Sequence, residues 1–269
     1  MIVFYLLIII FGLIVGSFIS ALTFRLPRKI SVLKGRSFCD YCKKSICWYD
    51  NIPLFSYLIL RGKCRSCRKN ISLRYPLIEI ICGLVFLLIY ILTQKCLTIL
   101  SIEPICNLTS TFGIWTLPYL LLISSNLITV FIVDLEERFI PDELVFFSLF
   151  ITITTLVVFS VNELYLNLSV AFIVSAFLLL IHLITSGRGM GLGDVKLALP
   201  LGLFFGWPYT LTWMYTSILM GAIIGLILIC LKKASFGRQI AFGPFLVTSF
   251  FVTLFWGNAL NKIIFFYLG

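Results

Sequence analysis

The sequence predicts an all-α polytopic membrane protein with about eight transmembrane helices and a cytoplasmic zinc-binding loop domain after the first helix. The chain is 61% hydrophobic and only 12% charged, whereas soluble domains carry roughly twice that charge. Its mean hydropathy is +1.10, and several apolar runs approach the roughly 20 residues that span a bilayer. Polar residues gather in short breaks between these runs and in one long basic segment.

The apolar runs predict the spans in chain order. They cover residues 2–24, 76–93, 116–133, 143–161, 167–185, a hairpin of two helices over 195–231, and 240–258. We expect a turn around Asn162–Asn167 and another near Trp207–Pro208, and Pro200 should kink the first hairpin helix unless it lies in the first turn. The first run has neither preceding basic residues nor a cleavage site, which favours a retained helix over a removed signal peptide.

The basic segment predicts both the domains and the orientation. Residues 25–75 contain 13 Lys and Arg, so we place them in the cytoplasm, between a first transmembrane helix (1–24) and a membrane domain (76–269). The other basic residues on that side are then Arg138, Arg188, Lys196, Lys232, Lys233 and Arg238, and only Lys95 and Lys262 lie outside. Both termini are therefore predicted outside. The net charge of +10 reflects this topology, and we expect no nucleic-acid partner.

Four cysteines in the basic segment have metal-ligand spacing. Cys39-x2-Cys42 and Cys64-x2-Cys67 are typical of a structural zinc site with four thiolate ligands. Dithiol–disulfide pairs are the alternative, which a cytoplasmic location disfavours. The remaining cysteines differ: three are expected to pack in apolar surroundings, and two share an external loop and could form a disulfide. The first group is Cys47, Cys82 and Cys230, and the second is Cys96 and Cys106.

Two acids lie at the ends of apolar runs: Asp134 follows one run, and Asp194 precedes another. Asp134 begins the sequence DLEERFIPDE, and Asp194 ends the glycine-rich stretch GRGMGLGD. A carboxylate at the edge of a membrane segment is costly and usually functional. The purely structural alternatives are that the Asp134 side chain reaches to the membrane–water interface and that Asp194 caps the next helix. Our central hypothesis is that Asp134 and Asp194 meet and form a two-carboxylate catalytic site.

Two neighbouring carboxylates can hydrolyse a peptide bond. They cannot both ionise, so one accepts a proton from water while the other polarises the carbonyl. Gly191 and Gly193 would let a substrate strand lie against the loop. Glu136 and Glu137 would attract a basic substrate, although both could be ordinary solvated acids. His182 lies in an apolar run and is interpreted as a packed or interfacial residue.

Ordered motifs along nearly the whole chain resemble the bacterial type IV prepilin peptidases, within the GxGD class of intramembrane aspartic proteases. The opening motif is Gly16-Ser17-Phe18 followed by Arg25-Leu26-Pro27, and the resemblance continues from Cys39 to Glu79. The matching segments in that region are Tyr49–Pro53, Leu60–Cys64 and Arg74–Pro76. Further matches are Asp134–Glu136 with Ile140–Asp142, Gly191–Lys196 and Phe242–Phe245.

The resemblance implies that Asp134 and Asp194 are catalytic and that 76–269 is a membrane peptidase domain. It implies cleavage of a basic leader from prepilins or pseudopilins after a glycine, on the cytoplasmic side of the bacterial inner membrane. It also implies methylation of the new N-terminus with S-adenosylmethionine, for which no sequence motif is found. The sequence does not predict the oligomeric state, nor whether the substrate belongs to a type IV pilus, a type II secretion machine or a competence machine.

Two other function classes are weighed against a protease. One is an ion-coupled transporter, but both acids are predicted at one membrane face, whereas transporter sites lie near the midplane. The other is a non-catalytic, zinc-organised assembly factor. Asp194→Asn separates these classes, because it should abolish processing by a protease and leave an assembly factor working.

Overall fold

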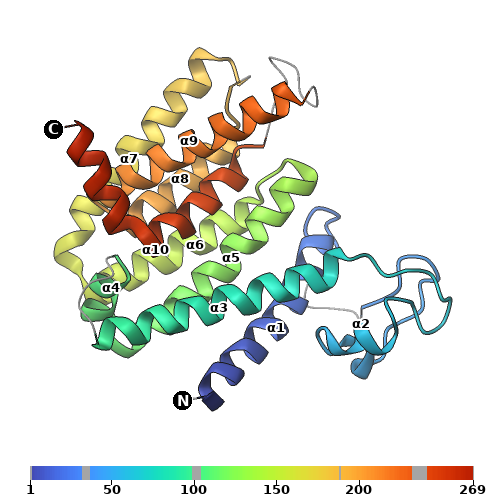
Figure 1. Ribbon diagram of the computed structural model, residues 1–269. Helices are drawn as coiled ribbons and strands as arrows, with labels where there is room; N and C mark the ends of the chain where they lie inside the picture. Colours follow the sequence, from blue (N-terminus) through green and yellow to red (C-terminus); the bar gives the residue numbers. More distant parts are fainter. Residues whose placement is uncertain (1, 32–36, 99–103, 188, 232–240, 269) are drawn as a thin grey trace. The chain divides into compact units, whose positions relative to one another are not determined.

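The computed structural model describes residues 2–31, 37–98, 104–187, 189–231 and 241–268, and these residues form helices without any extended strand. The helices in chain order are α1 (Ile2–Arg25), η1 (Trp48–Asn51), α2 (Phe55–Ile59), α3 (Arg74–Thr98), α4 (Ile105–Phe112), η2 (Gly113–Trp115), α5 (Thr116–Glu137), α6 (Asp142–Phe159), α7 (Val161–Ile184), α8 (Leu192–Phe205), α9 (Tyr209–Cys230) and α10 (Gly243–Leu268). Figure 1 shows this order. The predicted fold class is confirmed.

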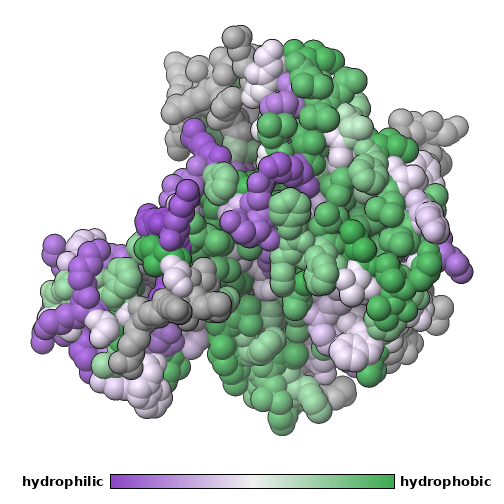
Figure 2. All heavy atoms as spheres, turned by 180° about the vertical axis from the view of Figure 1, so that it is seen from behind, coloured by the Kyte–Doolittle hydropathy of each residue, from purple (hydrophilic) through white to green (hydrophobic). Residues whose placement is uncertain are grey.

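Within these residues, seven helical segments are long and apolar enough to cross a membrane, where about eight were predicted. The difference is α8. It has 14 residues and is therefore about 21 Å long, short of the roughly 30 Å of a hydrocarbon core. Pro200 lies inside α8, beyond its first turn. Large apolar side chains are exposed along the long helices, and Figure 2 shows hydrophobic residues over much of the helical surface. Such surfaces suit contact with lipid.

One predicted turn is wrong and another is confirmed. Asn162–Asn167 lies inside α7, and the chain breaks earlier, at Ser160. Asn167 is buried beside Gly206, so its polarity marks a tertiary contact and does not mark a loop. The hairpin turn does fall near Trp207–Pro208, between α8 and α9. Arg188, Lys232, Lys233 and Arg238, which entered the predicted orientation, lie outside the described residues.

The chain divides into two compact units. Unit 1 comprises Met1–Ile91 and Leu117–Thr129, and unit 2 comprises Leu92–Thr116 and Val130–Gly269. The predicted segments 1–24 and 25–75 thus both fall in unit 1, and 76–269 is shared between the units. In unit 1, α1 and α3 pack through glycines: a Cβ on Gly12 would lie 2.8 Å from Gly83 Cα, and one on Gly16 would lie 2.7 Å from Glu79 Cα. Small residues allow such close helix contacts in membranes.

Unit 2 buries aromatic and polar contacts between its helices. The rings of Phe204 and Phe250 lie 4.8 Å apart, and the indole N–H of Trp213 donates to the Leu246 carbonyl at 2.9 Å.

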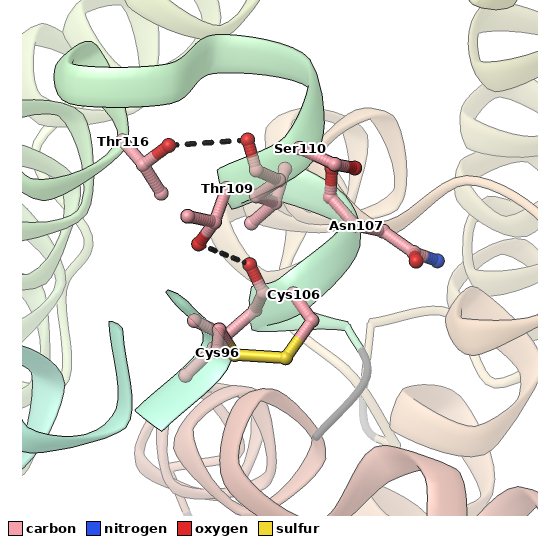
Figure 3. The surroundings of a disulfide bond; sticks show 8 residues. Cys96, Cys106, Asn107, Thr109, Ser110 and Thr116 are labelled. Carbon is pink, nitrogen blue, oxygen red and sulfur yellow. Dashed lines mark hydrogen bonds between the residues drawn. A yellow bond between two sulfur atoms is a disulfide. The ribbon is translucent and has the colours of Figure 1, made fainter. Parts of the chain in front are cut away.

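Cys96 and Cys106 form a disulfide, as the sequence allowed. Figure 3 shows its surroundings, where the Thr116 hydroxyl at the start of α5 donates to the Leu108 carbonyl of α4 at 3.1 Å.

Candidate functional site

Asp134 lies in the last turn of α5, where unit 2 buries it. Asp134 is 5% exposed, although Glu136 and Glu137 in the same turn are exposed. The helix ends because Arg138 adopts a left-handed conformation (φ 53°) while its N–H donates to the Asp134 carbonyl at 3.0 Å. The predicted alternative, a carboxylate reaching to the interface, does not describe this buried side chain.

Asp194 lies in the first turn of α8 and is 6% exposed. Gly191 is the N-cap of the helix, and Asp194 occupies the third helical position, from which its Oδ2 accepts the Gly191 N–H at 3.1 Å. Asp194 is therefore not the N-cap, as the alternative had it, but its side chain reaches back from the first turn to the N-cap N–H. A Cβ on Gly193 would lie 3.2 Å from Ile140 Cβ, so this glycine allows α8 to approach the segment that follows Asp134.

The fold of unit 2 brings the two carboxylates together. They are close enough for the charge of Asp134 to act on Asp194, and the backbone N–H of Gly243 interacts with both. A Cβ on Gly243 would collide with Asp134 Oδ2. That oxygen is buried and has no hydrogen-bond partner among the described residues. The site thus has two carboxyl groups, one backbone N–H that interacts with both, and one carboxylate oxygen that accepts no hydrogen bond among the described residues.

Gly243 was missed as a site residue by reasoning from the acids. Its only sequence signal was its place in Phe242–Phe245, a segment far from both aspartates along the chain. The glycine loop before α8 is held by α7: His182 Nδ1 and the Met190 carbonyl oxygen lie 2.7 Å apart. His182 is therefore a partly buried partner of this loop.

Asp142 is the first residue of α6, a position from which its side chain could cap the helix, but it does not do so. The N-cap of α6 is Pro141, and no side chain caps the helix. Asp142 instead pairs with Lys196 Nζ at 2.8 Å, with both side chains about half exposed. An extended Pro141 already sets the start of the helix, so the Asp142 carboxylate is left to face solvent. Asp142 is the other aspartate of this segment that could be considered for the catalytic role of Asp134, but it is exposed whereas Asp134 is buried.

The second candidate site is the set of four cysteines in unit 1. The Sγ atoms of Cys39, Cys42, Cys64 and Cys67 all lie within 4.8 Å of one another and could hold a metal ion. Cys39 Sγ and Cys67 Sγ are 3.8 Å apart, about the separation that tetrahedral Zn–S bonds of ~2.3 Å require. The N–H groups of Cys67 and Ser66 lower the pKa of the Cys64 thiol to about 7. The donor set therefore fits a metal that prefers thiolates.

The first cysteine pair lies on a tight turn. The Cys39 N–H donates to the Lys44 carbonyl at 3.0 Å, and the Lys43 N–H donates to the Cys39 carbonyl at 2.9 Å. Lys43 has a positive φ of 58°, and a backbone bridge joins Phe38 to Ser45. This conformation turns both thiols of the pair to one side.

The second pair repeats this turn 25 residues later. The Cys64 N–H donates to the Lys69 carbonyl, and the Arg68 N–H donates to the Cys64 carbonyl, both at 2.9 Å. Arg68 has the same φ of 58°, and a bridge joins Lys63 to Asn70. The sequence carries a signal of this duplication that was missed: two basic residues, a small polar residue and an isoleucine follow each CxxC pair, in Lys43–Ile46 and in Arg68–Ile71.

The cysteines outside this cluster follow the prediction in part. Cys82 is fully buried, as expected of a packing residue. Cys47 and Cys230 are exposed, which corrects the prediction for both: Cys47 precedes η1 at the surface of the cysteine-rich segment, and Cys230 is the last residue of α9.

Comparison with known proteins finds matches over nearly the whole chain. Residues 10–93 match the family model described as Bacterial Peptidase A24 N-terminal domain, and residues 120–226 match the Type IV leader peptidase family. Similar relatives include the "Prepilin leader peptidase/N-methyltransferase" of Stutzerimonas stutzeri, 30% identical over 96% of this chain and 92% of that protein. Those of Legionella pneumophila and Pseudomonas aeruginosa are also 30% identical, over 98% and 96% of this chain and 94% and 92% of theirs. No solved structure matches.

Proposed function

The chain belongs to the type IV leader peptidase family, and we propose that it is a membrane aspartic endopeptidase of the bacterial inner membrane. Its substrates are prepilins or pseudopilins, from which it removes a basic leader after a glycine before methylating the new N-terminus. The observation that carries the peptidase proposal is the burial of Asp134 and Asp194 around the Gly243 N–H.

The two carboxylates have complementary roles in the proposed hydrolysis. One is ionised and takes a proton from the attacking water, while the other is protonated and donates a hydrogen bond to the scissile carbonyl oxygen. The water oxygen bonds to the carbonyl carbon, the C–N bond breaks, and the leaving nitrogen takes a proton. Burial strengthens these interactions by excluding bulk water. Asp134 Oδ2, which accepts no hydrogen bond from the residues that the structure describes, suits the position of the water-activating oxygen.

The position of the disulfide supports the proposed orientation. Asp134 lies about five turns, or ~27 Å, along α5 from Thr116, which contacts α4 beside Cys106. Disulfides persist in oxidising compartments, so the Cys96–Cys106 end of unit 2 faces outward. The aspartates at the other end of α5 then face the cytoplasm, as the basic residues also indicate. The proposal that both termini lie outside requires the short α8 to cross the membrane together with α9 as a hairpin.

The proposed leader-binding elements lie next to the aspartates. Glu136 and Glu137 are exposed in the last turn of α5, where they can attract a basic leader, and Gly191 and Gly193 give a substrate strand access to Asp194. Cleavage by the variant Glu136→Gln with Glu137→Gln should fall more for basic leaders than for neutral ones. Rising salt should weaken wild-type cleavage of basic leaders. Equal loss on both leader types would show that these acids support the fold.

Zinc is the ion proposed for the four cysteines, with a structural role. The methyl donor of the second activity is S-adenosylmethionine, which supplies the methyl group when bound.

The experiment is co-expression with a prepilin, followed by mass measurement of the N-terminus of the product. Wild-type enzyme should yield a shortened protein that carries one added methyl group. Asp194→Asn should leave the leader in place while the enzyme still accumulates in the membrane. The matched control is Asp142→Asn, an acid in the exposed pair with Lys196, which should process most of the substrate. Processing by Asp194→Asn at a comparable level would overturn the assignment.

A further inference from the structure

A single peptide group joins His182 to the carboxylate of Asp194. Met190 and Gly191 are neighbours in the chain, so the Met190 carbonyl and the Gly191 N–H belong to the same planar amide. The carbonyl oxygen lies 2.7 Å from His182 Nδ1, and the N–H donates to Asp194 Oδ2 at 3.1 Å. The imidazole and the carboxylate are therefore connected by two hydrogen bonds and one amide, all within unit 2.

The direction of the first hydrogen bond follows from its acceptor. A carbonyl oxygen cannot donate, so His182 Nδ1 carries the proton, whether the ring is neutral or cationic. An amide whose carbonyl accepts a hydrogen bond is more strongly polarised, and its N–H becomes a stronger donor. The His182 bond therefore strengthens the bond from the Gly191 N–H to Asp194, and it also fixes the plane of the amide between them.

The end of α7 holds the same loop at a second point. The Thr185 hydroxyl donates to the Ile181 carbonyl at 2.8 Å and accepts the Gly189 N–H at 3.1 Å. Gly187 has a positive φ of 74°, and a Cβ at this position would lie 3.2 Å from His182 Cε1. Helix α7 also packs along α8 (Figure 1). The loop thus leaves one helix, is fastened to it, and enters the other helix at Asp194.

The carboxylate end of this connection is shielded from water. Met190 is 8% exposed and Asp194 is 6% exposed, so bulk water does not replace a lost partner, and each hydrogen bond acts at low dielectric. Asp194 is also close enough for the charge of Asp134 to act on it. A rotation of the Gly191 N–H would move the Asp194 carboxylate relative to Asp134, and catalysis is sensitive to such displacements.

We propose that His182 is a positioning residue for Asp194 and acts through the Met190–Gly191 amide. The inference deepens the proposed peptidase activity and rests on the catalytic role that it gives to Asp194. While the His182 bond is in place, the Asp194 carboxylate stays turned toward the Gly191 N–H and at the distance from Asp134 that proton sharing requires. His182 keeps its proton throughout, so it acts on the geometry of the site and does not serve as a base.

The amide can be observed directly, because methionine precedes glycine only at Met190–Gly191 and Met220–Gly221. Full-length protein in detergent, labelled with ¹³C at the methionine carbonyl and ¹⁵N in glycine, therefore gives two correlated amide signals. Met220→Leu removes the second signal and so assigns the first. His182→Leu should shift the Met190–Gly191 proton upfield, because its N–H then donates less strongly. The Met220–Gly221 signal from α9 should stay in place.

The matched control is His182→Asn, since asparagine has the shape of leucine and carries an N–H where the imidazole has Nδ1. Its Met190–Gly191 signal should stay near the wild-type position. Cleavage provides the second readout, at equal membrane accumulation. His182→Leu should lower kcat about tenfold with KM nearly unchanged, as expected for the loss of one hydrogen bond that acts in the transition state. His182→Asn should recover most of this loss.

The readouts separate this inference from the peptidase assignment. A Met190–Gly191 signal that does not move in His182→Leu overturns the connection, while Asp194 remains the proposed catalytic acid. Equal losses of kcat in the leucine and asparagine variants would show that the ring only packs against the loop. Unchanged cleavage by His182→Leu overturns the positioning role even if the signal shifts. Processing by Asp194→Asn overturns the proposed function, and with it the positioning role, whatever the signal does.

Discussion

The aspartate site and the cysteine site are held together by different forces. Asp134 and Asp194 lie at helix ends that apolar packing buries in unit 2. The four cysteines are only partly buried and lie on turns joined by short-range backbone hydrogen bonds. Packing can preserve the first arrangement without any ligand, whereas the second needs a metal to offset the conformational entropy of its loops. The helices therefore hold the two aspartates in place before any ligand binds, whereas the cysteine-rich segment keeps its conformation only when a metal ion is bound.

The largest expected effect is the loss of cleavage when either aspartate is neutralised. Asp134→Asn and Asp194→Asn should each lower the cleavage rate by roughly 10³-fold or more, because each removes one half of a single proton-sharing unit. The double variant should be little worse than either single one. Rates are measured with purified enzyme and a fluorescent leader peptide. Losses that multiply in the double variant would mean that the two acids act separately.

Gly243→Ala should lower cleavage by about 100-fold, because its methyl group would displace the Asp134 carboxylate and small misplacements of catalytic groups are costly. The matched control is Gly83→Ala in α3, where the added methyl group meets chiefly the flexible end of Leu13. Cleavage and membrane accumulation are measured for both. Wild-type activity in Gly243→Ala would show that this backbone does not set the distance between the aspartates.

Metal removal should affect the cysteine site far more than the aspartate site. We expect about one zinc per chain, lost with a strong chelator or in Cys64→Ser. The cysteine-rich segment should then become protease-sensitive, while cleavage falls only a few-fold, because the proposed catalytic water needs no metal. Cys47→Ser, at an exposed cysteine outside the cluster, is the control. Metal analysis and limited proteolysis decide the outcome, and an equally resistant metal-free protein would contradict it.

The smallest effect on activity is expected at the disulfide. Replacing both Cys96 and Cys106 with Ser should leave cleavage unchanged, since the bond lies at the end of α5 away from Asp134. It should lower Tm by roughly 5 °C, because a short closed loop is released in the unfolded chain. A reductant should shift the wild type equally and the variant not at all. Alkylation of both cysteines in unreduced wild-type protein would disprove the bond.

What the sequence determined by itself is local. Apolar runs identified the helices because each needs about 20 consecutive apolar residues. Two CxxC pairs identified the four cysteines that could hold a metal, because ligand spacing is a short-range property. The cost of an acid at a membrane edge made Asp134 and Asp194 candidates, and the family resemblance implied that they are the catalytic pair.

The tertiary structure decided what depends on contacts between distant segments. It shortened α8, placed the break at Ser160 instead of Asn162–Asn167, and paired Asp142 with Lys196. It also brought Gly243 to both aspartates and enclosed Glu79 in a cavity. These features follow from which surfaces pack together, and packing is set by complementary shapes across the fold, which spacing along the chain does not encode.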